Sequence, residues 1–169
     1  MADKHANILD DATFTTLLAK VAAGDHSLRD QTMILLSYKA GLRAQEIAGL
    51  LWSNVCDANG RVRQDHLFVP SSIAKGAKEA TLPMHPHLYI LLTQLRAARP
   101  DDLRVTYAVK PQKGRKHMTP GSVKMWFLRL YEAHKLEGCS SHSGRRTFIT
   151  RLARKAGQYD CSIVDVMKM

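Results

Sequence analysis

The chain has 169 residues, of which 45% are hydrophobic, so it can bury a core in one domain without metals or disulfides. Its formal net charge of +10 indicates an anionic partner, with nucleic acid as the leading candidate. Ribosomal proteins and some membrane-surface proteins are equally basic. The composition therefore narrows the class of partner but does not give a function.

The three cysteines, Cys56, Cys139 and Cys161, are widely spaced and form no Cys-x-x-Cys pair. We therefore expect no metal site and infer a reducing, cytoplasmic compartment. No apolar run approaches the roughly 20 residues that a membrane span requires. Residues 1–7 also lack the apolar core of a signal peptide, so no membrane partner is expected.

The first part of the chain predicts two amphipathic helices. Residues 9–23 carry apolar side chains at helical spacing, with Asp10 as the N-cap. Residues 27–30 resemble a capping box that opens a second helix, and Gly41 is a suitable C-terminal stop. The second helix is apolar on more than one side, which predicts that it is buried.

A third predicted helix covers residues 44–51 and places Arg43 at the turn between two buried helices. An arginine here can be a surface residue that caps a helix end. However, Glu46 lies one helical turn further on, and its carboxylate can hold Arg43 in a fixed position.

The middle of the chain predicts a small antiparallel sheet. Residues 66–69 and 80–83 have the composition of short strands, and residues 74–78 have that of a hairpin tip. The tip carries Lys75 and Lys78. Two lysines on a hairpin tip are usually only solvated charges, so they carry no function without further context.

Two further helices are predicted, separated by an irregular basic segment. One begins at His85-Pro86 with a leucine stripe, and the other has Thr119 as N-cap and Pro120 at its first position. The aromatic residues of the latter lie at core spacing, which favours a core over a base-stacking platform. The segment between them can be a solvated loop or can bind a sugar-phosphate backbone, and its basic residues are Lys110, Lys113, Arg115, Lys116 and His117.

A last long helix is expected to begin close to His142 and to end at Gly157, with Phe148, Ile149 and Leu152 on its buried side. Helical spacing places His142 and Arg145 on one face. An imidazole beside a guanidinium can grip a phosphate. Arg146 adds positive charge, and a short final helix is expected from residue 162 onward.

Together these elements predict a mainly α fold with a small antiparallel β-sheet (α+β), forming one domain over residues 1–169.

Three of these motifs, in this order, resemble those of the tyrosine recombinases, the phage-integrase family. The stretch around Arg43, Gly-Leu-Arg-Ala-Gln-Glu-Ile, is similar to the family's first arginine box. Lys75 resembles its hairpin lysine, and His142 with Arg145 matches its His-x-x-Arg box. The resemblance covers nearly all of the chain and implies the recombinase catalytic-domain fold.

The sequence departs from the family pattern at Gly144, where an apolar residue is more usual, and at its end. The family continues with a Leu-Gly-His stretch and then the tyrosine that attacks DNA, whereas this sequence stops at Met169. Tyr159 lies upstream of the last expected helix and does not match that tyrosine. The small DNA-clamping domain that usually precedes the catalytic domain is also not in the sequence.

The resemblance implies transesterification at a phosphodiester of double-stranded DNA, without metal or cofactor, and a bacterial or phage origin. Arg43 and Arg145 would stabilise the transition state, Lys75 would protonate the leaving 5′ oxygen, and His142 would accept the tyrosine proton or bind the phosphate. Glu46 would orient the site. DNA-backbone contacts are expected from the remaining basic residues, Lys78, Lys110, Lys113, Arg115, Lys116 and Arg146.

Three functions remain open from the sequence. The first is a recombinase catalytic domain that binds DNA weakly and does not cleave it as this fragment. A complete enzyme would be a tetramer on DNA, and this fragment a monomer. The second is a non-catalytic DNA-binding relative, favoured by the missing tyrosine but not by the complete Arg–Lys–His–Arg set. The third, an RNA-binding or ribosomal protein, is disfavoured because the aromatics have core spacing.

Overall fold

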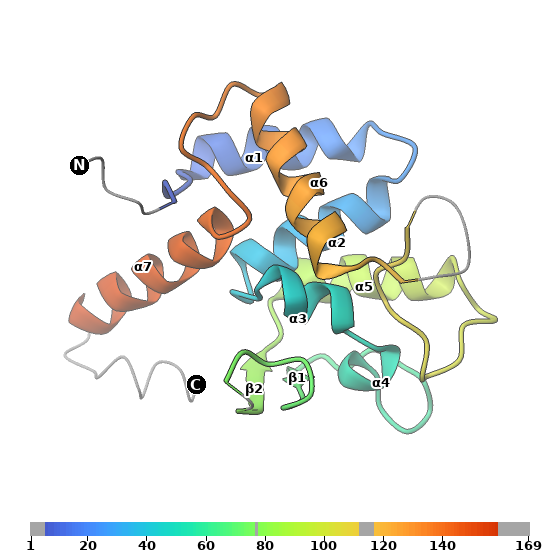
Figure 1. Cartoon of the computed structure of the whole chain (residues 1–169). Coiled ribbons are helices and arrows are strands. Elements are labelled where there is room, and N and C mark those ends of the chain that lie inside the picture. The colour runs from blue at the N-terminus through green and yellow to red at the C-terminus, as the bar shows by residue number, and fades with distance from the viewer. Residues whose placement is uncertain (1–5, 77, 112–116, 159–169) are drawn as a thin grey trace.

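A computed structural model describes residues 6–76, 78–111 and 117–158 of the chain. It confirms a mainly helical fold with one small antiparallel sheet, as Figure 1 shows. The elements in chain order are α1 (Asp11–Ala22), α2 (Ser27–Tyr38), α3 (Ala44–Gly49), α4 (Trp52–Val55), β1 (His66–Val69), β2 (Ala80–Pro83), α5 (Pro86–Ala97), α6 (Pro120–Ala133) and α7 (Ser143–Gln158).

Helix α2 is the centre of the fold. It packs against α1, α3, α5 and α7, and α6 in turn covers α3. Its apolar residues Met33, Leu35 and Leu36 are fully buried. The burial of α2 on several sides, which the sequence predicted, therefore follows from helices that contact it from different directions.

The other helices present apolar stripes to this core. The four leucines of α5 are buried, as predicted, and on α6 the same holds for Val123 and Phe127. Trp126 and Leu130 are only partly buried but pack against the same core. The aromatic residues of α6 are thus core residues and not an exposed base-stacking surface.

Three predicted helix boundaries are confirmed by their hydrogen bonds or backbone angles. The Asp10 carboxylate accepts the Thr13 N–H at 2.7 Å, and the Thr119 hydroxyl accepts the Ser122 N–H at 3.1 Å. Helix α2 ends at Tyr38, and Gly41 follows with a φ of 67°. This left-handed conformation reverses the chain toward α3 and is one that glycine adopts at little cost.

The two strands pair as predicted, with Leu67 opposite Leu82 and Val69 opposite Ala80. Leu67 and Val69 point into the core and are buried. The connection over residues 70–79 extends from this small sheet and carries Lys75 and Lys78.

Two of the predicted boundaries in the first half of the chain are wrong. Ser27 is the first residue of α2 and not a capping residue, and Asp30 instead pairs with Arg29 at 2.6 Å. The predicted helix over residues 44–51 ends at Gly49 because the backbone on either side of Leu51 pairs with another segment. Leu50 accepts the Ala108 N–H at 2.8 Å, and Trp52 donates to Thr106 at 3.0 Å.

The predicted buried side of α7 is right for Phe148 and Leu152, which are partly buried, and wrong for Ile149. Ile149 is 44% exposed, and the buried residues are Ser143, Gly144, Thr147 and Ala156. A Cβ atom added at Gly144 would lie 2.3 Å from Ser37 Oγ and 3.2 Å from its backbone carbonyl carbon. Helix α7 therefore packs on α2 through small residues at close range, and Gly144 departs from the family pattern because no side chain fits there. The predicted stop at Gly157 is wrong as well, since the helix runs to Gln158.

We predict that Gly144→Ala lowers the free energy of unfolding by about 1–3 kcal/mol, because a buried contact with no spare room becomes overpacked. Gly157→Ala is the matched control, since the same methyl group at Gly157 would meet nothing within 4 Å. In a helix this control should be neutral or stabilising by up to about 1 kcal/mol. Denaturant unfolding of both variants tests the contact, and equal effects at the two positions would contradict it.

Candidate phosphate-binding site

The first half of the site is the turn from α2 into α3, where Glu46 fixes Arg43 at two points. The Arg43 backbone N–H donates to Glu46 Oε2 at 2.7 Å, and its guanidinium Nη1 donates to Oε1 at 3.1 Å. Glu46 is 5% exposed, whereas the Arg43 side chain keeps 32% of its surface exposed. The carboxylate thus lies on the buried side of the Arg43 guanidinium, and the other side of the guanidinium remains exposed to solvent.

The second half comes from α7 and reaches the same carboxylate. Arg145 Nη1 donates a short hydrogen bond to the Gly41 carbonyl oxygen and lies 3.9 Å from Glu46 Oε2. A Cβ at Gly41 would lie 2.4 Å from the ring of Phe148, so only glycine lets α7 approach this turn. The turn at Gly41 therefore supplies both an acceptor and the room for Arg145.

His142 lies directly before the first residue of α7, and its backbone N–H donates to Ser140 Oγ at 3.2 Å. Partial burial lowers the pKa of its imidazole below the usual value, and the nearby positive charges of Lys124, Arg43, Lys75 and Arg145 lower it further. The imidazole is therefore neutral at pH 7 and can accept a proton.

Lys75 is exposed on the connection between β1 and β2, and its charge acts on His142. The charge of the hairpin lysine therefore adds to those of the two arginines at His142. Lys124, exposed on α6, acts on His142 as well. Lys124 belongs to no motif of the sequence, so only the structure shows that it lies near His142.

The site carries an excess of positive charge. Arg43 and Arg145 share one carboxylate, Glu46, and the charges of Lys75 and Lys124 act with theirs on His142. Burial lowers the pKa of Arg145, and so does the like charge of Arg43, while Glu46 opposes both effects. Two guanidinium groups held near each other by a single carboxylate are incompletely neutralised, and an anion such as a phosphate would complete the balance.

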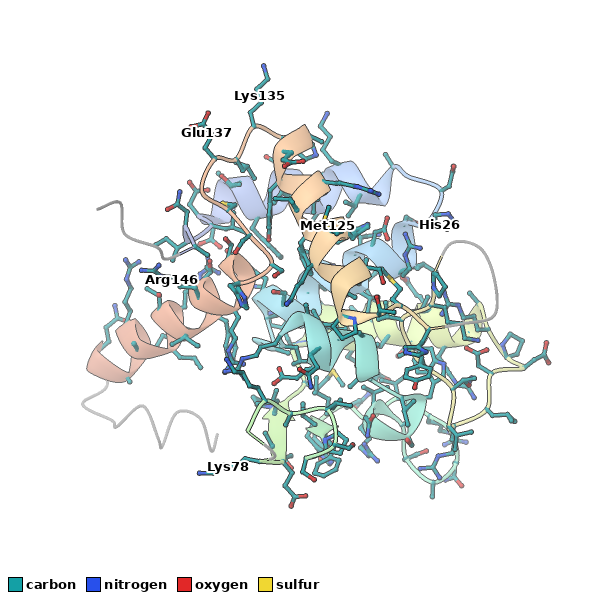
Figure 2. The ribbon with its side chains drawn as sticks, viewed as in Figure 1. His26, Lys78, Met125, Lys135, Glu137 and Arg146 are labelled. Atoms are coloured by element: carbon teal, nitrogen blue, oxygen red, sulfur yellow. The ribbon has the colours of Figure 1, made fainter. Side chains whose placement is uncertain are left out.

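The other predicted DNA contacts are scattered. Lys78 is exposed, and Figure 2 shows it extending outward below the sheet. Arg146 is exposed on α7 and donates to the Ala6 carbonyl at 3.0 Å. Lys110 is partly buried in an ion pair with Asp102, which also accepts the Trp52 indole N–H. Lys113, Arg115 and Lys116 lie outside the described residues.

The tyrosines at 38, 89, 107 and 131 are engaged away from this site. Tyr38 donates to Asp11 at 3.4 Å, Tyr89 accepts from Gln64 at 3.3 Å, Tyr107 stacks on His117, and Tyr131 is 3% exposed. Tyr159 and the helix expected from residue 162 lie outside the described residues. Within the described ranges, no group of three His, Cys, Asp or Glu side chains is placed to hold a metal ion.

The model of the phage integrase family matches residues 7–167. The chain belongs to this family. The match spans both halves of the site and confirms the resemblance to the tyrosine recombinases that Arg43, Lys75, His142 and Arg145 suggested.

Solved structures agree with this fold. The chain is 20% identical to the Tn1549 transposon integrase in complex with circular intermediate DNA, with a TM-score of 0.68 over 100% of this chain and 58% of that one. XerA recombinase is also 20% identical, with a TM-score of 0.68 over 90% and 53% of the two chains. The integrase from mycobacterium phage Brujita is 25% identical, with a TM-score of 0.57 over 84% and 43%.

The first solved chains that it matches are longer, and this chain spans 43% to 62% of their length. No curated protein sequence matches the chain. Among the helices that the structure describes, none is both long and apolar enough to cross a membrane.

Proposed function

We propose that this chain is the DNA-binding catalytic domain of a site-specific recombinase or integrase, which acts by transesterification at a DNA phosphodiester. The observation that carries the proposal is the pair Arg43 and Arg145, from distant parts of the chain, gathered around the Glu46 carboxylate. Membership in the phage integrase family supports it. So do related folds solved with DNA, such as XerH bound to its palindromic difH substrate.

In this mechanism the two arginines bind the non-bridging oxygens of the scissile phosphate. Negative charge grows on these oxygens in the transition state, and donors fixed beforehand stabilise it without reorganising. The double attachment of Arg43 to Glu46 and the bond from Arg145 to the Gly41 carbonyl provide such fixed donors.

Lys75 and His142 have the proton-transfer roles. Lys75 is exposed on a hairpin connection and can reach a leaving 5′ oxygen, to which it would give a proton. His142 is neutral at pH 7 because its pKa is lowered, so it can take the proton of an attacking tyrosine or bind the phosphate. No metal or cofactor takes part in these steps.

The proposed partner is double-stranded DNA in the cytoplasm of a bacterium or a phage-infected cell. A complete recombinase would act as a tetramer on DNA, and this chain by itself would be a monomer. Lys78, Lys110, Lys113, Arg115, Lys116 and Arg146 would contact the DNA backbone. Lys110 is the weakest of these candidates, since Asp102 already pairs with it.

We predict that the chain binds short duplex DNA with an affinity that falls steeply between about 50 and 200 mM salt, because phosphate contacts release counterions. Arg145→Ala should weaken binding about tenfold or more and reduce the salt slope by about 1. Arg61→Ala removes the same charge from an exposed turn and is the matched control, expected to cost less than about threefold. Fluorescence anisotropy over a salt series measures both. An Arg145 variant that behaves like the Arg61 variant would contradict the proposal.

We further predict that the chain forms no covalent adduct with DNA by itself, because the four tyrosines among the described residues, at positions 38, 89, 107 and 131, are buried or engaged by other residues, and Tyr159 does not match the family's nucleophile. Denaturing electrophoresis after incubation with labelled duplex DNA tests this, and a retained protein–DNA band would overturn it. In a protein that joins this domain to a nucleophilic tyrosine, cleavage should be lost in Arg43→Ala and Arg145→Ala. Such a protein that binds its sites but never cuts would instead support a non-catalytic DNA-binding relative.

A further inference from the structure

The segment before α1 forms hydrogen bonds with both ends of the stretch that contains His142 and Arg145. Upstream of that stretch, Asn7 donates its backbone N–H to the Gly138 carbonyl at 2.9 Å and its side-chain amide to the Glu137 carbonyl at 2.8 Å. Downstream of it, the Leu9 N–H donates to Thr147 Oγ1 at 2.8 Å. We refer to this segment together with the first residue of α1, residues 6–11, as the strap.

The strap lies close against the turn that leads into α7, and Figure 1 shows the two segments next to each other. A Cβ atom on Gly138 would lie 2.4 Å from Asn7 Nδ2, and Gly138 has a φ of 71°. Only a glycine therefore allows this approach. Figure 2 shows the Glu137 side chain directed outward, so its backbone carbonyl is the group that Asn7 uses.

Two further contacts extend the strap along the helix. Arg146 Nη1 donates to the Ala6 carbonyl at 3.0 Å, and Arg151 Nη2 pairs with Asp11 Oδ1 at 2.6 Å. The Asp11 side chain is 83% exposed, so solvent screens this ion pair and its contribution is small. The buried bond between Leu9 and Thr147 is the stronger attachment.

Thr147 connects the strap to His142 through a series of hydrogen bonds. It is 3% exposed, accepts from Leu9, and donates to the Ser143 carbonyl at 2.8 Å. Ser143 Oγ accepts the Ser140 N–H at 3.0 Å, and Ser140 Oγ in turn accepts the His142 N–H at 3.2 Å. Bonds that share groups in this way restrict one another's geometry.

We infer that the strap positions the catalytic face of α7. In this inference Thr147 and Asn7 determine where His142 and Arg145 lie relative to Arg43 and Glu46. The inference rests on the proposed function, which makes His142 and Arg145 catalytic residues. The alignment of α7, however, can be measured without DNA. Thr147 and Asn7 are positioning residues, since the bonds described here join them to the backbone around the site and not to its charged groups.

The test variant is Thr147→Val, which keeps the shape of the side chain but loses both hydrogen bonds. Thr147→Ser retains the hydroxyl and should restore the wild-type behaviour. The matched control is Thr32→Val on α2. Thr32 is fully buried and donates to the carbonyl four residues earlier, that of Leu28, at 2.6 Å, so it loses a similar bond at a site away from the strap.

The readout is the pKa of His142 from an NMR titration of its ring. If α7 loses its alignment, His142 gains solvent and moves away from Arg43, and its pKa should rise toward 6.5 in Thr147→Val. The Thr147→Ser and Thr32→Val variants should keep the low value. Duplex DNA affinity should fall about threefold to tenfold in Thr147→Val only.

A milder variant covers the case in which Thr147→Val does not fold. Asn7→Ala removes one exposed side-chain bond, and Asn59→Ala, in an exposed turn, is its control. Asn7→Ala should raise the His142 pKa by a smaller amount, whereas Asn59→Ala should leave it unchanged. A His142 pKa that moves equally in test and control variants, or in none, would overturn the inference. Failure of the wild-type chain to bind DNA would count against the proposed function but not against the strap.

Discussion

The site depends on the buried carboxylate of Glu46. A carboxylate that is 5% exposed needs charged or hydrogen-bonding partners, because an unpaired charge in such a place is costly. Its two oxygens face the backbone and guanidinium of Arg43, with Arg145 3.9 Å away. One buried anion thus brings together two arginines that lie far apart in the sequence, and their outer sides remain available for a second anion.

The helical core holds the two halves in register. Helix α2 contacts both α3, which follows Arg43, and α7, which carries Arg145. The contact with α7 is made at close range by Gly144 and leaves Ser37 Oγ buried without a hydrogen-bond partner among the described residues. The packing energy gained where the two helices approach closely therefore exceeds the cost of one missing hydrogen bond. The strap then fixes the outer side of α7, so that the helix is held from two directions.

Local chemistry made much of the fold predictable from sequence. The strands, the caps at Asp10 and Thr119 and the leucine stripe of α5 each follow from nearby residues. Tertiary contacts decided the rest. The helix after Arg43 ends early because its last residues pair with a segment near residue 106, and α7 buries small residues instead of Ile149 because α2 lies so close. Neither effect leaves a local pattern in the sequence.

The sequence supplied candidate residues for the site but not the contacts that connect them. Arg43, Lys75, His142 and Arg145 matched known boxes, and the pairing of Arg43 with Glu46 followed from helical spacing. Lys124 and the strap were missed, because the first belongs to no motif that the sequence shows and the second depends on hydrogen bonds between segments far apart in the chain.

The most direct test of the central claim is a double-mutant cycle on duplex DNA affinity with Arg43→Ala, Arg145→Ala and the combined variant. If both arginines bind the same phosphate beside Glu46, replacing either one should already weaken the contact that the other makes with that phosphate. The combined loss should then be smaller than the sum of the single losses by about 1 kcal/mol or more. Losses that add to within about 0.5 kcal/mol would mean that the two arginines bind independently, and would contradict the shared site.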